Sequence, residues 1–127
     1  MRIRRGEIYL ADLGPIGVLA SGEPAREIAK RRPVIIISTN AVNRISERQP
    51  FYVLVMPGTT GESSFRNFPT NVRLAPEESG LRSEGVFLAH QLRAVDVRRL
   101  SASPIGRISG NAMERVERAI RYVLLAG

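Results

Sequence analysis

Several residue types are absent or rare in this chain. The sequence has no cysteine, one lysine (Lys30), one histidine (His90) and two aspartates (Asp12 and Asp96). Without cysteine there is no disulfide, no cysteine nucleophile, no iron–sulfur cluster and no thiolate zinc site. The scarcity of histidine and aspartate makes a site with several imidazole or carboxylate metal ligands hard to assemble. We therefore expect no metal site and no cofactor.

The sequence also has no pattern typical of a targeting segment or a membrane-spanning segment. No run approaches the roughly 18–20 apolar residues that cross a bilayer. The start of the chain is basic, but polar Gly6 and Glu7 stand where a signal peptide needs its apolar run. We expect a soluble protein that does not bind membranes and works in the cytoplasm.

The composition favours one basic globular domain. The 127 residues, of which 43% are hydrophobic, suit a single domain over residues 1–127. The net charge is +7, and all 19 basic residues except Lys30 are arginine. Arginine binds phosphate bidentately and stacks on bases, so the excess favours a polyanionic partner. A genome biased toward arginine codons is the alternative explanation.

Short apolar runs rich in β-branched residues predict strands. The runs lie at residues 8–11, 34–37, 52–56, 70–74, 85–89 and 92–95. The run at 34–37 is apolar at every position, which is typical of a strand buried on both faces. We expect Pro57-Gly58 to end the third strand. The pattern predicts a small, curled antiparallel sheet.

The last segment has helical spacing. Ser109 is a plausible N-cap, and Glu117 and Arg121 are spaced as a favourable i,i+4 pair. The apolar positions that recur on one face are Met113, Val116, Ile120, Val123 and Leu124. Because a sheet this small needs a cover, we expect this stripe to pack on it. The predicted class is an α+β, barrel-like domain.

Two long loops and the strand ends beside them carry the candidate site residues. The loops span residues 14–32 and 57–69, and long loops in small domains are often functional. Arg32 precedes Pro33 at the start of a buried strand, where a guanidinium can hold a phosphodiester and stabilise charge on phosphorus. A surface arginine in the basic stretch Lys30-Arg31-Arg32 is the alternative.

Hydroxyl, imidazole and amide groups complete the candidate set. Thr59 and Thr60 offer hydroxyls that bind phosphate well, although threonines are also common in turns. His90 is a candidate proton shuttle or a structural histidine, and Gln91 can read a base edge. The spacing does not choose between Glu7, Glu23 and Glu84 as general bases.

Motifs in order along the chain resemble the MazF/PemK family of toxin endoribonucleases. They are Arg5–Pro15, Arg32–Ser38, Asn40–Arg44, Val55–Thr60, Gln91–Asp96, Arg99-Leu100 and Ile105–Ile108. The resemblance covers nearly the whole chain. It implies a homodimer of small SH3-like antiparallel β-barrels, each with a C-terminal helix.

The resemblance also implies an activity. Members cleave single-stranded RNA, such as mRNA, at specific sequences without a metal. In this reaction the 2′-OH attacks the phosphorus and leaves a 2′,3′-cyclic phosphate. A small antitoxin, expected to be acidic, neutralises them. The family's catalytic arginine and threonine fall on Arg32 and Thr59. Its RNA-groove glutamine falls on Gln91, and we expect His90, Arg31 and Thr60 to bind RNA beside them.

The sequence departs from the family pattern at two places that bear on RNA recognition. His90 replaces a residue that is usually acidic, and the 14–32 loop is long, with Ser21-Gly22-Glu23 in place of Gly-Ser-Glu-Gln. The cleaved sequence therefore does not carry over. The alternatives are a non-catalytic RNA-binding module and a gyrase-poison-type toxin. The latter is expected to have a C-terminal tryptophan, which this chain lacks.

Overall fold

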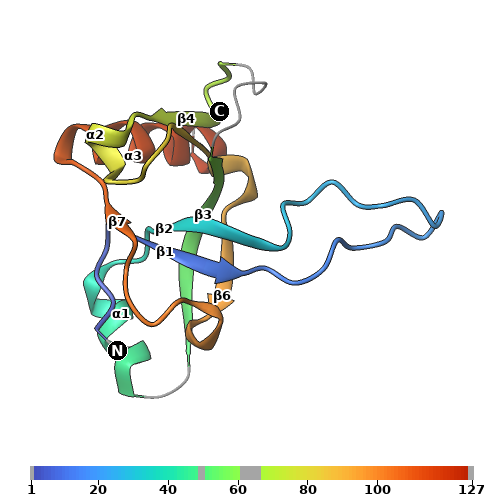
Figure 1. Ribbon diagram of the computed structural model, residues 1–127, viewed down its shortest axis with the longest axis horizontal. Helices are drawn as coiled ribbons and strands as arrows, with labels where there is room; N and C mark the ends of the chain where they lie inside the picture. The colour runs from blue at the N-terminus through green and yellow to red at the C-terminus, as the bar shows by residue number, and fades with distance from the viewer. Residues whose placement is uncertain (1, 49–50, 61–66, 126–127) are drawn as a thin grey trace.

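The computed structural model is a curled antiparallel sheet with a helix across one side and a long arm projecting from it (Figure 1). It describes residues 2–48, 51–60 and 67–125. The strands are β1 (Glu7–Asp12), β2 (Arg31–Ile36), β3 (Tyr52–Thr60), β4 (Asn71–Leu74), β5 (Gly85–Leu88), β6 (Arg93–Asp96) and β7 (Gly106–Arg107). The helices are α1 (Asn40–Arg48), α2 (Pro76–Ser79) and α3 (Gly110–Leu124), with 3₁₀ turns η1 (Ala89–Gln91) and η2 (Val97–Arg99).

Strand β3 holds the sheet together. Within the described ranges the strand order is β4-β5-β3-β2-β1-β7, and β6 also pairs with β3. All of these pairs are antiparallel. Strand β3 pairs with β2 and β6 along its first part and with β5 at its end, so the sheet curls around it. The predicted α+β class and the curled antiparallel sheet are confirmed.

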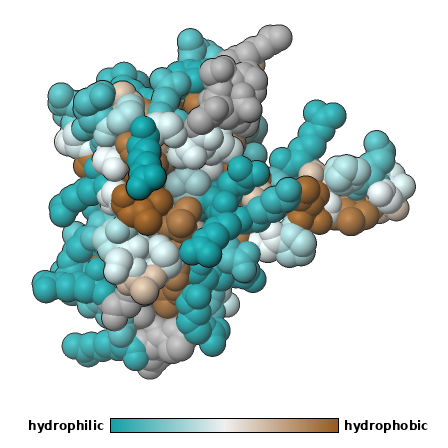
Figure 2. Space-filling view, in the orientation of Figure 1, coloured by the Kyte–Doolittle hydropathy of each residue, from teal (hydrophilic) through white to brown (hydrophobic). Residues whose placement is uncertain are grey.

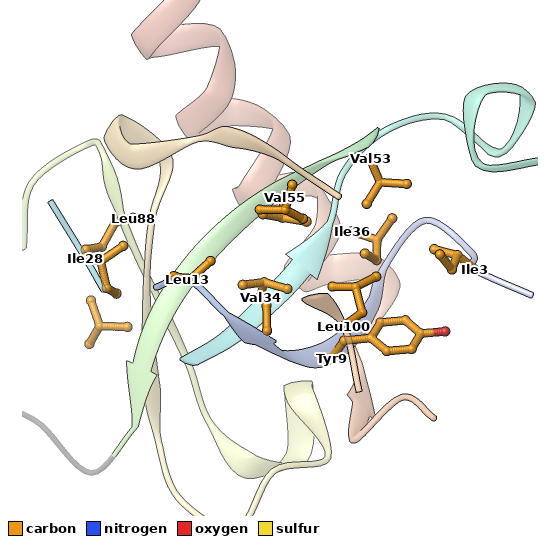
Figure 3. Close-up of a cluster of buried hydrophobic side chains, with 13 residues drawn as sticks. Ile3, Tyr9, Leu13, Ile28, Val34, Ile36, Val53, Val55, Leu88 and Leu100 are labelled. Carbon is orange, nitrogen blue, oxygen red and sulfur yellow. The ribbon is translucent and has the colours of Figure 1, made fainter. Parts of the chain in front are cut away.

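Strand β2 separates two apolar cores. Val34 and Ile36 belong to an inner cluster enclosed by the curl, whereas Ile35 and Ile37 belong to a second cluster on the opposite face. This follows from the alternation of side chains along a strand and confirms the predicted burial on both faces. Figure 3 shows the inner cluster running from Ile3 and Tyr9 at one end to Leu13, Ile28 and Leu88 at the other.

Helix α3 covers the second cluster, as predicted. The Ser109 hydroxyl accepts a hydrogen bond from the Ala112 N–H at 3.2 Å, which caps the helix. Ala112 and Val116 are fully buried against the sheet. The stripe ends earlier than predicted, because Leu124 is 60% exposed at the last turn. None of the helices in the described part of the chain is long and apolar enough to cross a membrane.

The predicted Glu117–Arg121 pair is wrong. Glu117 instead accepts a hydrogen bond from the Arg5 guanidinium, with 3.1 Å between Nη2 and Oε2. Arg5 also donates from Nε to the Ile37 carbonyl oxygen. A tertiary partner held by two contacts replaces the local i,i+4 partner. The pair thereby joins α3 to the N-terminal segment.

The predicted end of the third strand at Pro57-Gly58 is also wrong, and with it the start of the 57–69 loop. Strand β3 continues to Thr60, because β5 provides new partners as β2 leaves. Gly58 makes this possible, since a Cβ there would stand 2.5 Å from the Phe87 ring and 2.7 Å from the Val86 carbonyl oxygen. Part of the remaining loop, residues 61–66, lies outside the described residues.

The predicted 14–32 loop is an arm with hairpin character. Strand β2 begins at Arg31, and residues 13–30 run out from the sheet and back (Figure 1). At its base, the Leu13 N–H donates to the Lys30 carbonyl and the Lys30 N–H donates to the Gly14 carbonyl, at 2.8 and 2.7 Å. Farther out, Val18 and Pro24 form an antiparallel bridge. The arm is therefore an extension of the β1–β2 pair.

Candidate functional site

A cavity of about 270 Å³ lies where the arm leaves the sheet. Its lining includes Arg32 from the start of β2, Thr59 from the end of β3 and Gln91 from η1. Ile28 and Leu88 also line it, and both belong to the inner core. The cavity therefore sits at the open end of the inner core, on the rigid ends of two buried strands.

The alternation of side chains along β2 and β3 accounts for this meeting. Arg32 shares the inward side of β2 with Val34, and Thr59 follows Val55 at an even spacing along β3. The ladder between the two strands ends at Val34 and Pro57, and two more residues in the same register set Arg32 opposite Thr59. Because the strands have separated there, the cavity occupies the opening.

Arg32 is held at its inner nitrogen and free at its outer ones. Nε donates to the Ala29 carbonyl oxygen at 3.0 Å, and the side chain is half-buried. No other hydrogen bond or ion pair to Arg32 occurs among residues 2–48, 51–60 and 67–125. The two terminal amino groups are thus available to a bidentate anion.

Thr59 has an unpaired hydroxyl. Its Oγ1 is buried and has no hydrogen-bond partner in the described structure. Leaving a buried hydroxyl unpaired costs about 1–3 kcal/mol, so such groups usually have a partner. Because Thr59 lines the cavity beside the Arg32 cation, its hydroxyl is suited to donate to an anionic ligand there.

Gln91 ties the arm to the body of the protein. Its Oε1 accepts a hydrogen bond from the Ile28 N–H, with 2.5 Å between the two atoms. This contact uses the amide oxygen and leaves the amide nitrogen for other partners. Gln91 and Ile28 also line a second, neighbouring hollow of about 440 Å³, so their contact lies in the wall between the two spaces.

The other three predicted residues lie outside the cavity. His90 is exposed on η1 and lines the second hollow. Arg31 is exposed and stands opposite Asp12 in the β1–β2 register, on the other side of β2 from Arg32. Thr60 lines a separate hollow of about 170 Å³ with Pro33. The alternation that brings Arg32 and Thr59 together turns their chain neighbours away.

Sequence analysis missed two lining residues on the arm. Glu27 lines both the cavity and the second hollow. Lys30 lines the cavity with a φ of 68°, a left-handed conformation that costs about 1–2 kcal/mol for a residue with a side chain. The sequence feature that points to Glu27 as a lining residue is its position only five residues before Arg32. Nothing in a lysine predicts a positive φ.

Metal-ligating residues do not gather in this part of the molecule. The described residues contain no group of three or more histidine, aspartate or glutamate side chains that could hold a metal ion. The cavity offers a guanidinium, a hydroxyl and an amide instead. These groups bind anions, and phosphate oxygens above all.

The fold and the cavity define a small basic half-barrel protein with a cavity suited to an anion at its open end. A family model described as PemK-like, MazF-like toxin of type II toxin-antitoxin system matches residues 4–124, and the chain belongs to this family. The endoribonuclease EndoA of Bacillus subtilis (strain 168) is 27% identical over 124 residues, covering 98% of this chain and 96% of EndoA.

Solved structures show the same fold. MazF from Deinococcus radiodurans superimposes with a TM-score of 0.73 at 20% identity, over 98% of this chain and 97% of that one. A mycobacterial endoribonuclease, solved in complex with its cognate antitoxin, gives a TM-score of 0.71 at 23% identity over 98% of each chain. The match over nearly full lengths confirms the resemblance and the fold inferred from the sequence.

Proposed function

We propose that this protein is a toxin endoribonuclease that cleaves single-stranded RNA at specific sequences. The observation that carries the proposal is that Thr59, whose buried hydroxyl has no partner among the described residues, lines one cavity with half-buried Arg32. EndoA, a relative over the full length, is named for the same activity. The net charge of +7 favours binding of a polyanion.

The proposed reaction is a transesterification within the RNA. The 2′-oxygen forms a bond to phosphorus and gives up its proton, while the bond from phosphorus to the 5′-oxygen breaks and that oxygen gains a proton. The products are a 2′,3′-cyclic phosphate and a 5′-hydroxyl. Because the nucleophile belongs to the substrate, the reaction needs no bound metal to generate it.

Arg32 and Thr59 stabilise the charge that builds up on phosphorus. The guanidinium neutralises the non-bridging oxygens of the five-coordinate state, and the hydroxyl donates a hydrogen bond to one of them. A guanidinium stays protonated at neutral pH and is a poor proton acceptor, so Arg32 is not the base. The bond from Nε to Ala29 holds the guanidinium in place before RNA binds.

The proposal includes partners and a compartment. We expect a homodimer, and an acidic antitoxin that folds over the basic surface on binding. The mycobacterial structure with its cognate antitoxin supports such a partner. Since the proposed substrate is RNA, we also propose that the protein acts in the cytoplasm.

The test is cleavage of a long RNA of mixed sequence in EDTA, with the new ends mapped. We expect cuts at one short motif, ending in 2′,3′-cyclic phosphate. Arg32→Ala should lower the rate by about 10²–10³, the usual cost of removing one preorganised donor. Its neighbour Arg31→Ala is the matched control and should lose far less, since Arg31 lies on the other side of β2.

Other outcomes overturn the proposal. RNA bound but left intact indicates a non-catalytic RNA-binding module of the same fold. RNA neither bound nor cut indicates a toxin with a protein target. Equal losses for Arg31→Ala and Arg32→Ala contradict the assigned site, because only one of the two side chains lines the cavity.

A further inference from the structure

The second hollow, beside the proposed cleavage cavity, has features of a base-binding site. It measures about 440 Å³, and Gln91 and residues 27–29 line both spaces. Along the arm, Pro15 and Gly17 face this hollow whereas Ile16 faces the cavity, as alternation along an extended chain requires. The two spaces are therefore neighbours on either side of one wall, suited to a phosphate and to an adjoining nucleoside.

Charged groups of both signs line this hollow without binding each other. The charged residues are Glu27 and Arg93, His90 lies beside them in the lining, and all three residues are exposed. Among the described residues, no hydrogen bond or ion pair involves any of the three side chains. An anion and a cation that line one hollow and stay unpaired can serve a ligand that has both donors and acceptors.

Guanine matches these groups better than the other bases. An arginine binds O6 and N7 of guanine with two parallel hydrogen bonds. A carboxylate can accept two hydrogen bonds from N1–H and N2–H of the same base, and among the four bases only guanine has these adjacent donors. Leu13 and Leu92 supply apolar lining for the faces of a flat ring. Unstacked bases of single-stranded RNA are read on these same edges.

We propose that this hollow selects a guanine next to the scissile phosphate, with Arg93 on O6 and N7 and Glu27 on N1–H and N2–H. The inference rests on the proposed function and deepens it by naming one position of the cleaved sequence. Glu27 and Arg93 are specificity-determining residues. His90 lies beside them and provides a ring that stacks or a further donor.

The experiment compares four RNA oligonucleotides that carry the mapped cleavage motif. They have guanine, inosine, 7-deazaguanine or adenine at the flanking position. Inosine lacks the N2 amino group, and 7-deazaguanine lacks N7. We expect the wild-type protein to cleave each of the three altered RNAs about 10–100-fold more slowly than the guanine RNA.

The variants assign each edge of the base to one residue. Glu27→Gln should slow cleavage of the guanine RNA and bring its rate to that of the inosine RNA. Arg93→Ala should do the same for guanine and 7-deazaguanine, while keeping the discrimination against inosine. Arg107→Ala on β7 and Glu114→Gln on α3, both exposed and outside the hollow, are matched controls that should keep the wild-type pattern.

Each outcome decides the matter. Cleavage with no guanine preference beside the cut overturns the guanine site and leaves the proposed function standing. Equal losses on all four RNAs in Arg93→Ala identify Arg93 as a phosphate contact and also overturn the guanine site. If no RNA is cleaved, the proposed function fails. In that case the affinities of the four nucleoside 3′-monophosphates are compared. If guanosine 3′-monophosphate binds no more tightly than the other three, the hollow is not a guanine site either.

Discussion

Two hydroxyls mark the opposite ends of the inner core, and they differ in their partners. At one end Tyr9 is 1% exposed, and its hydroxyl lies 3.3 Å from a carboxylate oxygen of Glu7. Burial and the Glu7 carboxylate together raise the pKa of Tyr9 to about 12. At the other end the Thr59 hydroxyl is buried with no partner among the described residues. The unpaired hydroxyl is thus at the end that opens to the cavity.

A pair of isosteric substitutions tests this difference. Thr59→Val removes the unpaired hydroxyl and should lower RNA cleavage by about 10²–10³-fold, since one preorganised donor to the phosphate is lost. The free energy of unfolding should stay the same or rise by about 1 kcal/mol, because a buried polar atom without a partner disappears. Thr60→Val, on the other side of β3, should change cleavage little.

Denaturation by urea and single-turnover cleavage on one RNA provide the two measurements. A loss of stability in Thr59→Val would show that the hydroxyl has a partner in the folded protein. Equal cleavage losses in the two variants would show that the strand end matters as a whole, and the Thr59 assignment would be wrong.

At the scale of elements, β3 determines the shape of the sheet by changing partners at Gly58. The register passes from β2 at Val34 and Pro57 to β5 at Gly58 and Phe87. The close approach of the Phe87 ring and the Val86 carbonyl leaves no room for a side chain at Gly58. The same crossing carries Thr59 to the cavity, so the glycine supports both the curl and the site.

Gly58→Ala should therefore destabilise the protein by about 2–3 kcal/mol, a usual cost of overpacking a core. A matched substitution is Gly110→Ala at the start of α3, where an added Cβ meets no atom within 4 Å. That variant should be neutral or stabilising by up to about 1 kcal/mol. Circular dichroism during urea unfolding measures both. Similar midpoints for the two variants would contradict the packing described at Gly58.

Strands and helices that bury apolar side chains in a core could be predicted from the sequence. Helix α1, whose apolar side chains are exposed, could not. The run at 34–37 and the stripe of α3 both bury their apolar side chains. Helix α1 went unpredicted, because Val42 and Ile45 are 39% and 57% exposed and, among its described side chains, the buried one is Asn43. Asn43 bonds to Ser38, an arrangement that no hydrophobic period reveals.

The candidate site divides in the same way. Arg32 and Thr59 follow buried strands, so their neighbourhood could be inferred from the resemblance and from strand ends. The second hollow could not, because it exists only once the arm folds back and Gln91 bonds to Ile28. For the same reason the sequence offers Glu23 as a candidate base and not Glu27, four residues on. Whether a glutamate reaches the site depends on how the arm folds back in space, and the number of residues along the chain does not reveal this.

At the scale of the molecule, we expect binding and catalysis to depend on different features: binding on the overall charge, and catalysis on the cavity. The net charge of +7 acts on any polyanion, whereas in the proposed mechanism the cavity acts on one phosphate. Binding of single-stranded RNA should then weaken as salt displaces condensed counterions. For about four phosphate contacts the logarithmic slope is about −3, which is a loss of about 50-fold between about 50 and 200 mM salt.

Fluorescence anisotropy with labelled RNA measures this slope, and RNA that lacks the 2′-OH at the scissile position prevents cleavage during the titration. The slope for Arg32→Ala should be smaller by about one contact than that of Thr59→Val, which keeps its full charge. A slope near zero would show that stacking and apolar contacts dominate, and would contradict the electrostatic account of binding.

The arm gives the protein a way to diversify. Its outer half carries exposed Val18 and Leu19, at 72% and 48%, and it projects away from both cores (Figure 2). Because little of the fold's stability depends on it, mutations there are nearly neutral for folding but alter what the two hollows meet. Such a protein can change its recognised sequence within a lineage while its chemistry stays fixed. Exchange of residues 15–28 between relatives is the corresponding route for engineering cleavage specificity.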